Sequence, residues 1–113
     1  MTTVHIGVTS RDDFKRRAKA AFRGEKQGEH IGFASLERMH KVLTPNRWTM
    51  LQAMMGREPM GIRELARALE RDVKQVHTDV TALINAGVID RTEAGAVTFP
   101  YDAVHVDFIV KAA

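Results

Sequence analysis

The sequence contains no cysteine among its 113 residues. This absence excludes disulfide bonds, thiolate metal ligands and cysteine nucleophiles, and it fits a reducing compartment such as the cytoplasm. Long apolar runs are also missing, because no stretch approaches the ~18 apolar residues that a membrane-spanning helix needs. The first residues lack the basic region and apolar run of a secretory signal. We therefore expect a soluble, cytoplasmic protein that does not bind membranes.

Recognisable catalytic motifs are missing as well. We find no phosphate-binding loop, nucleophile elbow or paired-carboxylate arrangement. The five histidines are scattered, and no two have the four-residue spacing that puts two metal ligands on one face of a helix. His5 and His105 lie in predicted strands and could meet if those strands pair, but solvated histidines are the commoner outcome. We expect no enzymatic activity, no cofactor and no metal site.

The charge is positive but unevenly distributed. The composition, 44% hydrophobic and 27% charged, is that of one globular core, and the net charge is +3 with a pI near 9.6. Residues 1–43 carry nine Lys or Arg and five Asp or Glu, residues 44–100 carry seven of each, and residues 101–113 carry one and two. The basic excess favours a polyanionic partner, although a solvated basic helix face explains it equally well.

The first third of the chain, residues 1–43, predicts an extension of strands and helices. Residues 4–8 alternate as a short strand, and Ser10 can cap a helix that runs to Gly24. A polar loop and a brief extended segment at residues 30–33 follow, and Ser35 can cap another short helix. We predict that this extension serves dimerisation or contact with a partner.

Residues 44–100 predict three helices followed by a hairpin. Thr44 precedes a proline at the first helical position, and the methionines at positions 54, 55 and 60 are interpreted as core. A second helix has apolar residues from Ile62 to Leu69, and Asp72 caps a third, with Gln75 completing a capping-box pattern. Gly87 is the expected left-handed stop. Residues 88–91 and 96–99 then read as two strands joined by a turn.

Residues 101–113 predict a last strand, because residues 104–110 alternate with one largely apolar face. Together with residues 4–8 this gives two apolar strands outside the helical unit. An unpaired strand exposes backbone donors and acceptors, which natural proteins usually avoid. We expect the two strands to pair, within one subunit or across subunits, and we predict a homodimer.

Three helices and a hairpin in this order are typical of an α+β winged helix-turn-helix, whose third helix enters the DNA major groove. On the third helix the polar residues that point outward predict base and phosphate contacts, although a solvated face explains any one of them singly. Arginines of the second helix, of the turn and of the hairpin suit phosphates. The candidate DNA-binding residues are Arg63, Arg71, Lys74, Gln75, His77, Thr78 and Arg91, with Arg67 as a further phosphate contact.

The segments 62–66, 76–83 and 87–89 resemble MarR-like winged helix-turn-helix regulators. The chain looks closest to a group of small archaeal and bacterial DNA-binding proteins, on the segments 43–47, 71–73 and 99–102. At position 78 it has threonine where many of these proteins have a basic residue. Some members of the group are encoded beside a toxin and regarded as antitoxins, so the resemblance implies a possible toxin partner.

We therefore predict a sequence-specific regulator of transcription that binds double-stranded DNA and represses as a homodimer. The alternative is an antitoxin-type interaction module that neutralises a toxin, with DNA binding as autoregulation. Salt-sensitive duplex binding by the isolated protein separates the first from a pure interaction module.

Overall fold

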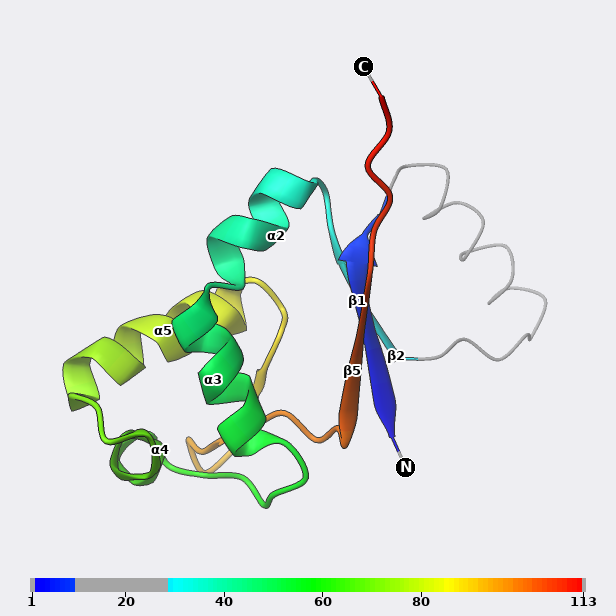
Figure 1. Ribbon diagram of the computed structural model, residues 1–113. Coiled ribbons are helices and arrows are strands. Elements are labelled where there is room, and N and C mark those ends of the chain that lie inside the picture. The colour runs from blue at the N-terminus through cyan, green and yellow to red at the C-terminus, as the bar shows by residue number, and fades with distance from the viewer. Residues whose placement is uncertain (1, 10–28, 113) are drawn as a thin grey trace.

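The computed structural model describes residues 2–9 and 29–112, and within them the chain forms a small α+β domain (Figure 1). The helix predicted after Ser10 lies outside these residues. The elements are, in order, β1 (Thr3–Val8), β2 (Glu29–Phe33), α2 (Leu36–Val42), α3 (Pro45–Met54), α4 (Ile62–Leu69), α5 (Val73–Asn85), β3 (Asp90–Arg91), β4 (Val97–Thr98) and β5 (Ala103–Asp107). No helix among the described residues is both long and apolar enough to cross a membrane.

The predicted caps at Ser35, Thr44 and Asp72 and the predicted stop at Gly87 are confirmed. The hydroxyls of Ser35 and Thr44 accept the backbone N–H groups of residues three further on, at 3.1 and 3.4 Å, and begin α2 and α3. The Asp72 carboxylate accepts two backbone N–H groups at the start of α5. Gly87, with φ +77°, follows the end of the same helix. These caps fix where each helix begins and ends.

The strands at the two ends of the sequence meet in one sheet. The order is β2-β1-β5 with both pairings parallel, so the predicted pairing of the first and last strands occurs within one chain. Thr2 donates to the Asp102 carboxylate from its backbone N–H and from its hydroxyl, at 3.1 and 3.2 Å, and these bonds lower the pKa of Asp102. Residues 1–43 and 101–113, predicted as separate extensions, therefore contribute to the same sheet.

The core lies between this sheet and the helices (Figure 1). Val4 and Ile6 of β1 are buried on the face toward the helices, where they join the buried side chains of α3, α4 and α5. Met54 and Met60 are buried in the same cluster, as predicted, and Met55 packs against it. The alternate residues of β1, including His5, lie on the opposite face of the sheet.

The hairpin is attached to the start of α4. β3 and β4 pair antiparallel, and Val97 of β4 also pairs with Met60, the two residues exchanging backbone hydrogen bonds of 3.0 and 2.8 Å. The predicted first strand of the hairpin is shorter than expected. It includes only Asp90 and Arg91, because the N–H groups of Val88 and Ile89 bond to the Leu83 carbonyl near the end of α5.

The predicted strand over residues 104–110 was wrong in length. β5 ends at Asp107, which pairs with Gly7, and Ile109 and Val110 are exposed. The cause is that β1 ends at Val8, so the later residues have no strand beside them in this sheet. Alternating apolar residues continue past the point where a partner strand is available.

Replacing Gly7 with alanine is expected to lower the free energy of unfolding by about 1–3 kcal/mol. An added Cβ would lie 2.4 Å from the backbone oxygen of Asp107, so β5 has to move away from β1. Gly61→Ala is the control, because nothing lies within 4 Å of the added Cβ there. Thermal melting of the two variants measures the difference, and equal melting temperatures would mean that β5 does not pair with β1 at Gly7.

Candidate functional site

Four of the predicted DNA-contact residues lie on the first two turns of α5. Helical periodicity buries Val76, Val80 and Leu83 completely, each at 0% exposure, against α3 and α4. This phase leaves the predicted contact residues Lys74, Gln75, His77 and Thr78 exposed. Of these side chains, Thr78 donates its hydroxyl to the Lys74 carbonyl at 3.0 Å, within the helix. The structure therefore brings four of the seven predicted site residues together on one surface.

The start of α5 is occupied by its own cap. The Asp72 carboxylate accepts the N–H groups of Lys74 and Gln75 at 3.1 and 3.3 Å. A helix N-terminus can bind phosphate through such amides, but here they already have an anionic partner. Any polyanion at this surface must therefore be contacted by side chains rather than by the helix N-terminus.

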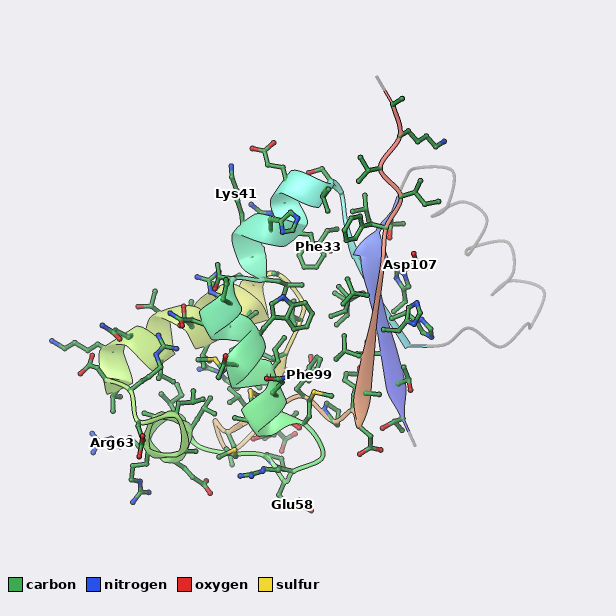
Figure 2. All side chains as sticks on the ribbon, viewed as in Figure 1. Phe33, Lys41, Glu58, Arg63, Phe99 and Asp107 are labelled. Atoms are coloured by element: carbon green, nitrogen blue, oxygen red, sulfur yellow. The ribbon has the colours of Figure 1, made fainter. Side chains whose placement is uncertain are left out.

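An open groove runs beside this surface, between α4 and the start of α5. Its volume is about 1010 Å³. The lining residues are Arg63, Ala66, Arg67, Glu70, Arg71 and Val73. Arg63 and Arg67 are one helical turn apart on α4 and both are exposed, and Figure 2 shows Arg63 pointing away from the body of the protein. Val73, 42% exposed, adds an apolar side chain that sequence reasoning did not single out.

Arg71 differs from the other predicted residues because it is held inside the protein. Its Nη2 lies 2.8 Å from Oδ2 of Asp79, and its side chain is 22% exposed. The Nη1 atom of the same guanidinium is buried and has no hydrogen-bond partner among the residues that the structure describes. This ion pair holds the guanidinium against the Asp79 side chain in the middle of α5.

The same carboxylate binds a second arginine, which sequence reasoning missed. Arg47 of α3 donates its Nε to Oδ1 of Asp79 at 3.0 Å, and its Nη1 donates to the carbonyls of Val42 and Lys41 at 3.0 and 3.3 Å. We call Arg47, Asp79 and Arg71 the arginine–aspartate cluster. It ties the end of α2, the start of α3 and the turn before α5 to the middle of α5.

Arg91 lies on the hairpin, at a distance from α5 along the chain. It is exposed and pairs with Val97, which in turn pairs with Met60. Neighbouring strands lie about 4.8 Å apart, so the Arg91 backbone is roughly 10 Å from that of Met60. Met60 precedes Arg63 by three residues. The two predicted phosphate contacts, Arg63 and Arg91, therefore both lie near the start of α4.

Three of the five histidines lie side by side on the sheet. His5 is in register with both His30 and His105, and the His5 and His105 rings are 5.1 Å apart between centroids. The conditional prediction that His5 and His105 meet through strand pairing is thus confirmed. Within residues 2–9 and 29–112, no group of three His, Cys, Asp or Glu side chains is arranged to hold a metal ion.

Comparison with known proteins gives a family and one similar structure. The model of the family described as HVO_A0114 matches residues 42–106, which include α3, α4, α5 and the hairpin. No curated protein matches the chain. A solved structure of a protein of unknown function from Listeria innocua is similar at 18% identity with a TM-score of 0.47, over 80% of this chain and 67% of that one.

Proposed function

The chain belongs to the HVO_A0114 family, and we propose that it binds double-stranded DNA through α5 as a winged helix-turn-helix regulator of transcription. The observation that carries the proposal is the exposed row on the first two turns of α5. Lys74, Gln75, His77 and Thr78 share a surface whose opposite face is the buried core. A recognition helix presents the residues of its N-terminal half to base edges in this way.

The surrounding elements support the winged helix. α4 and α5 are joined by only three residues, 70–72, and a hairpin follows α5 directly. The Met60–Val97 pairing attaches that hairpin to the chain just before α4, so that hairpin and helix pair form one unit.

The chemistry of the row suits the major groove. Lysine can reach guanine acceptors or phosphate, glutamine can form two hydrogen bonds with adenine, and threonine offers a hydroxyl and a methyl group. The exposed methyl groups of Val73 would add an apolar contact with thymine. Arg63, Arg67 and Arg91 would bind phosphates and fix the register on the duplex. Because Arg71 is held by Asp79, we assign it to orienting α5 rather than to the DNA.

We propose that the protein represses transcription as a homodimer. Residues 44–100 carry seven basic and seven acidic residues, so the proposed DNA-binding unit of one copy has no excess positive charge with which to hold DNA. Two copies would double the phosphate contacts and place two α5 helices about one helical turn of DNA apart, on an inverted repeat. An antitoxin that only binds a toxin would lack salt-sensitive binding to duplex DNA.

Two single substitutions should affect DNA binding in different ways. Gln75→Ala removes a base contact. It is therefore expected to reduce the difference in binding free energy between the preferred base pair and the other base pairs by ~1–3 kcal/mol at one position. Arg91→Ala should weaken binding to all DNA sequences alike, and the salt dependence of the binding constant should fall by the amount that about one phosphate contact contributes. Gel-shift titrations measure both, on a duplex selected from a random pool and on its scrambled form, at several salt concentrations.

The control is Gln52→Ala, which removes the same side chain from an exposed position on α3. It should bind both duplexes as the wild type does. If the double variant Lys74→Ala, Gln75→Ala also binds both duplexes unchanged, α5 is not the recognition helix.

A further inference from the structure

β5 is an edge strand that carries exposed apolar side chains. It pairs with β1 on one side, and no strand among residues 2–9 and 29–112 pairs with its other side. Val106 and Phe108 are about two-fifths exposed, and Ile109 is 81% exposed. In Figure 1 the segment after β5 extends beyond the sheet, away from the helices. Proteins usually protect such an edge, because its free backbone groups and apolar side chains invite another strand.

The backbone direction of β5 shows which groups lie at the open edge. The Ala103 N–H donates to the Thr2 carbonyl at 3.1 Å, on the side of the chain that precedes β1. Backbone groups alternate in direction along a strand, so those of residues 103, 105 and 107 point toward β1. Those of Val104 and Val106 therefore point toward the open edge.

We propose that the β5 edge binds the β5 edge of a second copy of this chain, antiparallel, with the two-fold axis at Val106. In this register the two Val106 residues exchange both of their backbone hydrogen bonds, as an antiparallel pair with outward-facing groups does. The two three-stranded sheets then become one continuous sheet. This surface would supply the interface of the homodimer proposed above, and it does not depend on DNA binding.

The side chains of β5 are complementary to themselves in this register. His105 lies opposite the partner's Asp107, and Val104 lies opposite the partner's Phe108. Both residues are exposed and share the outer face of the sheet, where His105 Nε2 is already 3.9 Å from the Asp107 carboxylate within one chain. A histidine opposite a carboxylate can share a hydrogen bond with it, and apolar pairs that face each other across antiparallel strands stabilise the pairing.

The neighbouring registers lack this complementarity. A shift of the second copy in one direction puts His105 opposite the partner's His105, and a shift in the other direction puts Asp107 opposite the partner's Asp107. Two carboxylates directly opposite each other destabilise a strand pair, and two facing histidines lack the carboxylate partner. The pairing of His105 with Asp107 therefore favours a second copy of the chain as the occupant and the register centred on Val106.

The test is the oligomeric state of the full chain in the absence of DNA, measured by sedimentation velocity over a concentration series. Val106→Pro removes the N–H that points to the open edge and leaves the bonds to β1 intact, because proline is tolerated on an edge strand. Two hydrogen bonds are lost per dimer, so dimerisation should weaken about 30-fold or more. Val106→Thr is the matched control, since it keeps the N–H and the β-branched shape, and it should dimerise as the wild type does.

A charge exchange tests the register independently. His105→Asp alone puts two carboxylates opposite each other and should weaken the dimer, and adding Asp107→Lys restores opposite charges and should recover it. Melting curves of each variant check that the chain is folded. A wild-type chain that remains a monomer at tens of micromolar overturns the proposal and leaves the edge to a different partner. A Val106→Pro variant that is folded and dimerises as tightly as the wild type overturns it too. Loss of DNA binding alone would count only against the proposed function.

Discussion

Replacing Asp79 with alanine is expected to lower the free energy of unfolding by about 3 kcal/mol, which is a large part of the stability of a small domain. The Asp79 side chain is 14% exposed and pairs with Arg47 and Arg71, which are 17% and 22% exposed. Without the carboxylate, two largely buried guanidinium groups lose their only anionic partner among the described residues. Leaving a buried charge uncompensated costs far more than an intact pair gains.

A double-mutant cycle on Arg47 and Asp79 separates this pairing from a loss of packing. Chemical denaturation of the two single variants and the double variant should give a coupling free energy above about 1 kcal/mol. The control cycle uses Glu37 and Lys41, whose side chains are 3.4 Å apart but 79% and 68% exposed. Exposed pairs one helical turn apart contribute only about 0.3–0.5 kcal/mol. Equal coupling in the two cycles would mean that the arginine–aspartate cluster is no stronger than a surface ion pair.

The arginine–aspartate cluster also bears on the proposed DNA-binding surface. Asp79 follows Thr78 directly, and it is bonded to residues of α3 and of the turn before α5. The exposed row on α5 is thereby held at a fixed angle to the rest of the domain. Sequence reasoning assigned Arg71 to a phosphate, together with the other arginines of the second helix and the hairpin. The ion pair becomes visible only once Asp79, eight residues further on, is placed opposite it.

The helices between residues 44 and 87 could be predicted because their signals are local. Thr44 with Pro45, Asp72, and Gly87 each act on backbone groups within four residues. The spacing of the apolar residues then predicted which face of α5 is buried, and with it the exposed row of the candidate site. These are short-range effects of hydrogen bonding and periodicity, and one sequence contains them in full.

The parts that could not be predicted depend on long-range pairing. Nothing in residues 104–110 indicates that the strand ends at Asp107, because the end is set by Val8 of β1, about one hundred residues earlier. The attachment of the hairpin through Met60 and Val97 is likewise a tertiary contact. Alternation indicates that a segment can form a strand, and the partner determines how much of it does.

Replacing Val80 with aspartate should unfold the domain, because Val80 is fully buried on the core face of α5. A carboxylate without a partner in this cluster costs on the order of 4–5 kcal/mol or more, whether it stays charged or takes up a proton at the cost of a raised pKa. Typical domains are stable by only about 5–15 kcal/mol. Circular dichroism during thermal melting should therefore show a loss of the cooperative transition, or a midpoint lowered by tens of degrees.

Thr78→Asp is the matched control, because it introduces the same residue two positions earlier on the same helix, where the side chain is exposed. It loses only the bond from the hydroxyl to the Lys74 carbonyl. Its melting temperature should stay close to that of the wild type. Its affinity for DNA should fall, because a negative charge would then face the phosphates. An unchanged melting curve for Val80→Asp would mean that Val80 is in solvent. The exposed face of α5 would then not be the one that carries Lys74 and Gln75. This pair of variants therefore tests the helical phase on which the proposed site depends.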